Sequence, residues 1–247
     1  QFKELAGVDI TAEPMEIAPP CHYIMGGIRV DADTEATGVP GLFAAGEVAA
    51  GLHGANRLGG NSLSDLLVFG RRAGMAASDF AEGRAGEPIF EDGELDAVFA
   101  EAEAPFTRGD GESPYEVHQD LQRMMQDLVG IIRTESELVQ ALDELDKLDD
   151  RAERLSVVGG RAYNPGWNLA TDLPSMLTVA RLVTKGALDR RESRGGQTRD
   201  DYAAADPELG KVTFVQRRSP AGEYLIAPEP LPAMPAELAT LLEEERS

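Results

Sequence analysis

The chain has 247 residues, enough for one large or two ordinary domains, and it carries a formal net charge of −21. This charge excludes a nucleic-acid-binding protein, because so few cations cannot neutralise a run of phosphates, and it excludes docking of the chain on an anionic membrane surface. The single cysteine, Cys21, excludes an internal disulfide and fits a reducing compartment.

Two short strands are predicted in the first part of the chain. Residues 23–30 alternate well enough for a strand, and Gly26-Gly27 within them marks a bend or a close backbone approach. An apolar stretch at residues 42–45 predicts a second strand, which ends in an acid, Glu47. No G-x-G-x-x-G turn is present, so we expect the pyrophosphate-binding half of a dinucleotide site to lie upstream and the chain to be the C-terminal portion of a longer enzyme.

A loop with five glycines between residues 46 and 60 follows. Glycines let a backbone approach a bulky ligand closely, and Glu47 at the end of a strand can accept hydrogen bonds from ribose hydroxyls. Arg57 lies inside the loop, where its fork of donors can hold a carboxylate. The loop therefore predicts a nucleotide-cofactor site that also binds an anionic substrate. The alternative is a glycine-rich connection with a solvated arginine.

A helix is predicted from residue 62 to about residue 82, with Asn61 or Ser62 as its N-cap. Its N-terminal N–H groups would attract an electron-rich or anionic group. Apolar side chains recur around this helix and predict that it is buried or nearly buried, with Gly70 and Gly74 allowing tight packing. The glycines at 83 and 86 end it, and a domain boundary is placed there.

The following hundred residues are acidic and poor in strand formers, so they predict a helical domain. The expected helices cover residues 94–103, 114 to about 130, 135 to about 159 and about 167–189. Thr134 and Glu137 form a capping box before the third of them. Together these segments predict an antiparallel bundle of three or four helices. In the tail, residues 211–217 and 224–227 predict a hairpin, and residues 236–245 a terminal helix.

Three blocks of the sequence resemble the flavoprotein subunit of succinate dehydrogenase and fumarate reductase, in its actinobacterial form. They read H-Y-x-M-G-G at 22–27, V-P-G-L-F-A-A-G-E at 39–47 and H-G-A-N-R-L-G-G-N-S-L at 53–63. A further match is E-S-R-G at 192–195 followed by D-Y at 201–202, although Gln197 stands where a histidine is expected.

The resemblance implies a mixed α/β and α fold in three parts. Residues 1–86 would be the C-terminal part of a Rossmann-like FAD-binding domain, 87–191 a three- or four-helix bundle, and 192–247 a small α+β tail. His22 resembles the histidine that hydrogen-bonds one substrate carboxylate, and Arg57 the arginine that clamps the other. The positions that resemble FAD-binding residues are Gly46, Glu47, Asn61, Ser62 and Leu63.

The implied reaction interconverts succinate and fumarate, with hydride passing between substrate carbon and flavin N5. No catalytic residue is expected in this chain, because the family's proton-carrying arginine belongs to upstream sequence. The implied partners are a membrane anchor subunit together with an iron–sulfur subunit, which would place the protein in the cytoplasm, at the inner face of the plasma membrane. Oxidation of a saturated C–C bond needs a redox cofactor, since no side chain accepts such electrons.

Two alternatives remain. L-aspartate oxidase belongs to the same superfamily, but its loop usually reads L-A-S-N-S where residues 58–62 read L-G-G-N-S. The other is that the helical region is an interaction module and the chain alone does no catalysis. His53 is interpreted either as a structural hydrogen-bonding residue or as a cofactor contact, and His118 as a surface residue. The three histidines are too scattered to predict a metal site.

Overall fold

The computed structural model describes residues 2–17, 22–84, 86, 93–238 and 240, so Cys21 lies outside the described residues. The chain divides into two compact units, residues 1–85 and 86–247. The helical region and the tail lie together in the second unit, and their separation near residue 191 stays a prediction.

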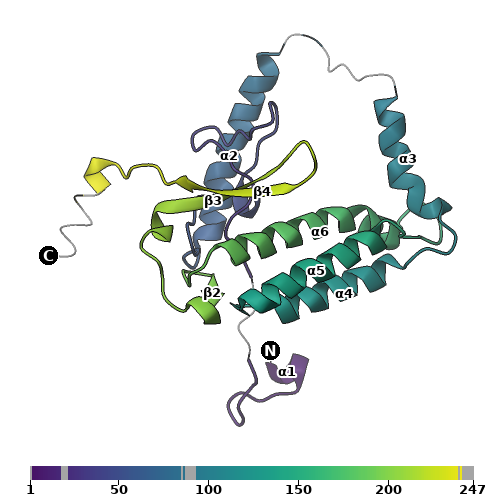
Figure 1. The fold of residues 1–247 in the computed structure, drawn as a ribbon, viewed down its shortest axis with the longest axis horizontal. Coiled ribbons are helices and arrows are strands. Elements are labelled where there is room, and N and C mark those ends of the chain that lie inside the picture. Colours follow the sequence, from purple (N-terminus) through teal and green to yellow (C-terminus); the bar gives the residue numbers. More distant parts are fainter. Residues whose placement is uncertain (1, 18–21, 85, 87–92, 239, 241–247) are drawn as a thin grey trace. The chain divides into compact units, whose positions relative to one another are not determined.

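The first unit contains helices α1 (Phe2–Ala6) and α2 (Asn61–Glu82) (Figure 1). It also contains a short 3-10 turn, η1 (Gly46–Val48). The strands predicted at residues 23–30 and 42–45 do not form. Each segment makes one isolated bridge instead, Ile28 with Ala49 and Phe43 with Ala36. A ladder needs a neighbouring extended strand, and the described part of this unit offers neither segment one.

Helix α2 has the predicted length but a different start. Gly60, at φ +85°, is its N-cap, and no side chain caps this end, so the prediction of Asn61 or Ser62 as N-cap is wrong. A capping Asn or Ser needs an extended backbone. Here the chain turns through a left-handed conformation that glycine adopts without strain.

The prediction that α2 is buried is also wrong for this chain. Leu63 is 68% exposed and Leu67 is 75% exposed, while Asp65 is buried. A Cβ added to Gly70 or Gly74 would meet no atom within 4 Å, so neither glycine permits a close helix contact here. The reason is that the other described segments of the unit cover only one side of the helix, leaving all three of its leucines exposed.

The second unit is built around α4 (Pro114–Leu128), α5 (Glu135–Ala152) and α6 (Pro165–Asp189), which lie side by side (Figure 1). Helix α3 (Glu94–Thr107) joins the start of α6, where the rings of Phe106 and Trp167 meet edge to face. The predicted helical bundle is therefore confirmed. Its core includes Val117, Leu121, Leu138, Leu145, Leu148, Leu173 and Leu177.

Local capping explains where two of these helices start. The Thr134 hydroxyl accepts from the Glu137 N–H at 3.4 Å, and the Glu137 carboxylate accepts from the Thr134 N–H at 3.0 Å, which is the predicted capping box. The Asn164 side chain accepts from the Trp167 N–H at 3.1 Å, so α6 begins at Pro165, slightly earlier than predicted.

The tail contains the predicted hairpin and one short parallel pair. Strand β3 (Val212–Arg218) pairs antiparallel with β4 (Tyr224–Pro230), and β1 (Ile132–Arg133) pairs parallel with β2 (Thr198–Arg199). The predicted terminal helix at 236–245 lies mostly outside the described residues.

Gln197, the departure from the family motif, still joins the tail to the bundle. Its Nε2 donates to the Ala187 carbonyl at 3.1 Å, and its Oε1 accepts from Arg133 Nη1 at 2.6 Å. The buried Arg199 donates to the same Ala187 carbonyl at 2.7 Å. Carbonyls at the end of α6 have no partner within the helix, and these tail side chains satisfy them.

Candidate functional site

The segment that begins at His22 is tied to the segment around η1 by backbone contacts. The Ile28 N–H donates to the Val48 carbonyl at 2.7 Å, and the Ala50 N–H returns to the Ile28 carbonyl at 2.8 Å. Gly27 has φ +134°, and a Cβ built on it would stand 2.2 Å from the Val48 oxygen. The close approach predicted for the paired glycines is therefore real at Gly27, and any side chain there would force the two segments apart.

Glu47 is exposed and reaches back to the same segment, where its Oε1 accepts from the Ile24 N–H at 3.0 Å. Gly46, just before it, is buried and has φ +78°; a Cβ there would lie 2.6 Å from a methyl carbon of Leu66. The two predicted cofactor residues of η1 are thus held between the His22 segment and α2.

A buried carboxylate on α2 organises the two aromatic side chains around it. Oδ2 of Asp65 accepts from the Tyr23 hydroxyl at 3.2 Å and lies 3.3 Å from His53 Nε2. The rings of Tyr23 and His53 meet edge to face, with centroids 5.4 Å apart. Burial, and then the hydrogen bond to Asp65, raises the pKa of the Tyr23 hydroxyl, which keeps it protonated as a donor.

Arg57 lies over this cluster. Its guanidinium carbon is 4.7 Å from the centroid of the Tyr23 ring, within cation–π range, and Nη1 donates to the Leu58 carbonyl at 3.3 Å. Its Nε is buried and has no hydrogen-bond partner within the described part of the chain. A buried donor without an acceptor is costly, so a ligand or solvent oxygen at Nε would stabilise this side chain.

The other predicted residues lie nearby in sequence but are placed differently. His22 is exposed and directly precedes Tyr23, while Asn61 and Leu63 are exposed in the first turn of α2 and Ser62 is half-buried there. Arg57 contacts Tyr23 and Glu47 contacts Ile24, so both residues are joined to the segment that starts at His22. Within the described residues, no hydrogen bond, ion pair or ring contact joins His22 itself to Arg57 or Glu47.

Sequence reasoning missed Tyr23 and Asp65 as functional candidates and left His53 undecided. The available signal was Asp65 itself, an acid in the apolar start of a helix. If such a group is buried it needs hydrogen-bond donors, and the tyrosine and the histidine of the neighbouring motifs are the donors at hand.

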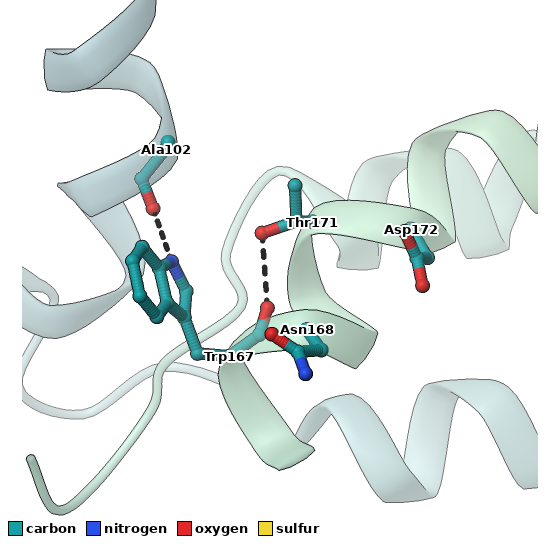
Figure 2. Close-up of a pocket in the computed structure, with 5 residues that line it drawn as sticks. All are labelled: Ala102, Trp167, Asn168, Thr171 and Asp172. Carbon is teal, nitrogen blue, oxygen red and sulfur yellow. Dashed lines mark hydrogen bonds between the residues drawn. The ribbon is translucent and has the colours of Figure 1, made fainter. Parts of the chain in front are cut away.

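The second unit has hollows of its own. Figure 2 shows one of about 360 Å³ between α3 and α6, where the Trp167 indole N–H donates to the Ala102 carbonyl at 2.7 Å and the Thr171 hydroxyl donates to the Trp167 carbonyl at 3.0 Å. The first bond joins α6 to α3, and the second lies within α6. Across the residues that the structure describes, no cluster of His, Cys, Asp and Glu could hold a metal ion, and no helix has the length and apolar character of a membrane span.

Comparison with known proteins gives a consistent result along the chain. Residues 1–63 match the FAD binding domain family, and residues 118–240 match the fumarate reductase flavoprotein C-terminal family. The first match contains the site residues from His22 to Leu63, and the second runs from within α4 to beyond β4.

Individual relatives agree. One component of the fumarate reductase (CoM/CoB) of Methanothermobacter marburgensis is 39% identical over 221 residues, which are 88% of this chain and 39% of that protein. The fumarate reductase flavoprotein subunit of Haemophilus influenzae is 37% identical over 81% of this chain and 34% of its own length.

Among solved structures, the Mycobacterium smegmatis Sdh1 complex in the apo form superposes with a TM-score of 0.90 at 47% identity, over 99% of this chain and 43% of that one. The chain therefore spans less than half the length of the proteins it resembles. With both family matches and these relatives in agreement, the chain belongs to the FAD-dependent flavoprotein-subunit family of fumarate reductases and succinate dehydrogenases.

Proposed function

We propose that the protein containing this chain interconverts succinate and fumarate, and that this chain supplies both carboxylate clamps. The observation that carries the proposal is Arg57, whose guanidinium is stacked on Tyr23 and whose buried Nε has no acceptor among the described residues. A carboxylate is the acceptor that such a planar fork of donors binds best. His22, on the segment that Tyr23 anchors, is the partner clamp for the second carboxylate.

The residues present fit FAD. Glu47 holds an exposed carboxylate at η1, and a Cβ on Gly59 or Gly60 would meet no atom within 4 Å, so the backbone before α2 is open to a bulky group. The first-turn N–H groups of α2, at Ser62 and Leu63, point out of the helix end and favour an electron-rich ring edge. Bound FAD would supply the two-electron acceptor that the chemistry requires, at its N5 atom.

The role of the chain's own residues is binding and orientation. Two clamps on the two ends of a C4 dicarboxylate fix the position of its central carbons, so that less entropy is lost on reaching the transition state. Arg57 pairs with the charge of one carboxylate, and His22 hydrogen-bonds the other. The proton-carrying arginine that the family motif implies is expected in upstream sequence, so no catalytic role is assigned within this chain.

Electrons are proposed to leave through an iron–sulfur subunit, with a membrane anchor subunit holding the complex at the inner face of the plasma membrane. The support is that relatives are named as subunits: one is the 8-methylmenaquinol:fumarate reductase flavoprotein subunit of Wolinella succinogenes, and one solved neighbour is the Sdh1 complex. Co-purification of an iron–sulfur protein with the tagged native protein would support this assignment, and recovery of the flavoprotein alone from membranes and cytosol would contradict it.

The test of the reaction uses the full-length, FAD-loaded protein with succinate, fumarate and aspartate. Arg57→Ala and His22→Ala should each lose turnover of succinate and fumarate while retaining flavin. Arg84→Ala is the matched control, because Arg84 also lies over an aromatic ring, Phe80, but at the far end of α2. Unchanged succinate kinetics in Arg57→Ala would overturn the proposal, and aspartate turnover would favour the L-aspartate oxidase alternative.

A further inference from the structure

The stack of Arg57 on Tyr23 rests on an anchored ring. Tyr23 is fixed at its hydroxyl by Asp65 and at its edge by His53, and Asp65 is only 4% exposed on a helix of 22 residues. A tyrosine in an otherwise mobile loop would offer a cation a moving surface. Here the ring is connected through Asp65 to the body of α2.

The same carboxylate oxygen also holds His53, which lies in the loop that carries Arg57. Oδ2 of Asp65 contacts both His53 and Tyr23. The Tyr23 ring and the loop that carries Arg57 are therefore held by the same carboxylate oxygen. Arg57 has several rotatable bonds, and holding it in one orientation has an entropic cost. The Arg57 guanidinium carbon lies 4.7 Å from the centroid of the anchored ring, within the range in which the ring attracts the cation.

We propose that Tyr23 is a positioning residue for the substrate clamp: its ring, anchored by Asp65, holds the Arg57 guanidinium in the orientation that receives a carboxylate. The proposal rests on the proposed function, since it assigns the orientation of the same clamp. It extends to His22 as well, because His22 directly precedes Tyr23 in the chain. Asp65 therefore sets both clamps without touching substrate.

The experiment measures binding of malonate, a dicarboxylate that does not react, to the full-length FAD-loaded protein, together with KM and kcat for succinate. Tyr23→Leu removes the ring and should raise the malonate Kd and the succinate KM by roughly five- to thirty-fold. Flavin content and kcat should change far less. Tyr23→Phe keeps the ring but loses the anchoring bond to Asp65, so its malonate affinity should lie between those of Tyr23→Leu and the wild-type protein.

The matched control is Tyr224→Leu, since Tyr224 also carries an arginine, Arg218, over its ring but lies in the tail hairpin. It should leave malonate binding unchanged. If Tyr23→Leu fails to retain flavin, the decisive comparison is phenylalanine against 3,4,5-trifluorophenylalanine at position 23. Fluorine withdraws charge from the ring face at nearly constant shape, so malonate binding should weaken with fluorination.

Two results separate the failure of this inference from failure of the proposed function. In the first, Tyr23→Leu or the fluorinated variant binds malonate as tightly as the wild-type protein does, while Arg57→Ala loses binding. This result would overturn the positioning role and leave the proposed reaction in place. In the second, Arg57→Ala binds malonate as tightly as the wild-type protein does. This result would overturn both the positioning role and the proposed function. Equal losses of kcat and affinity in Tyr23→Leu and Tyr23→Phe would indicate a general structural role and would also overturn the inference.

Discussion

The Tyr23 hydroxyl donates to the Asp65 carboxylate at 3.2 Å, joining the first family motif of the chain to the body of α2. Asp65 is a buried carboxylate whose acceptor oxygen is used by both Tyr23 and His53. This arrangement makes Asp65 the structural centre of the site, although neither the substrate nor the cofactor is expected to contact it.

Replacing Asp65 with alanine should loosen the site locally. The change leaves the Tyr23 hydroxyl and a His53 nitrogen without their acceptor, at a cost of about 1–3 kcal/mol. Hydrogen exchange of the backbone amides in residues 22–28 and 46–60 should accelerate by the factor to which this free-energy cost corresponds. Asp65→Asn retains an acceptor of similar size and is the matched control. Exchange as slow as in the wild-type protein would show that the cluster does not hold these segments together.

The two glycines of the first motif should tolerate alanine unequally. Both have positive φ, +123° at Gly26 and +134° at Gly27, so alanine is strained at either position by about 1–2 kcal/mol. At Gly27 the added Cβ would also stand 2.2 Å from the Val48 carbonyl oxygen, whereas at Gly26 it would meet no atom within 4 Å.

Gly27→Ala should therefore lose bound flavin and dicarboxylate affinity well beyond the loss in Gly26→Ala. Flavin absorbance per protein after desalting measures the first effect, and malonate titration the second. Because the two changes add the same methyl group at neighbouring positions, their difference isolates the steric contact. Equal losses in the two variants would mean that backbone strain alone causes the loss of flavin and of affinity. The chain would then move the Val48 carbonyl away from the added Cβ at little cost.

The bundle was predictable from the sequence for a local reason. Leu138, Leu145 and Leu148 recur at the period of one helix face, and the capping box at Thr134 lies within four residues of sequence. Periodicity and capping are properties of short segments, so they can be recognised without knowing the partners. The hairpin was predictable on the same basis.

The candidate site was predictable only in part. Glu47 and Arg57 were chosen for their chemistry, and both lie at the segment that begins at His22. Their contacts with Ile24 and Tyr23 join residues far apart in sequence, which no local pattern encodes. The strands predicted at 23–30 and 42–45 failed for the same reason, since an extended segment becomes a strand only beside another.

On helix α6, truncating a buried side chain should destabilise the protein more than truncating an exposed one. Leu177 is 1% exposed and lies in the core of the bundle, while Val179, two residues later on α6, is 53% exposed. Leu177→Ala should lower the free energy of unfolding of the second unit by about 2–5 kcal/mol, and Val179→Ala by less than about 1 kcal/mol. Urea unfolding followed by circular dichroism measures both. Similar losses in the two variants would mean that α6 is rotated about its axis, so that a different face points into the core.

The ion pair between Asp201 and Arg199 should make stability depend on acid pH. Arg199 Nε and Nη2 each donate to the Asp201 carboxylate at 2.8 Å, and these bonds lower the pKa of Asp201 from 3.8 to about 2. The folded pKa lies below the unfolded one, so the stabilisation is fully present above about pH 4 and is lost as the pH falls toward 2. The carboxyl is 28% exposed, which reduces the expected contribution to about 1–2 kcal/mol.

Asp201→Asn should therefore lower the free energy of unfolding by about 1–2 kcal/mol at pH 7, and the difference from wild type should shrink between pH 4 and pH 3. Asp200→Asn is the matched control, because Asp200 is the adjacent exposed carboxylate. The measurement is urea unfolding at a series of pH values. The carboxylate of Asp201 also accepts from the Glu135 N–H at the start of α5 at 2.7 Å, so the loss should appear at that helix end first. A difference that stayed constant down to pH 3 would show that the asparagine acts through its shape, and not through the lost charge.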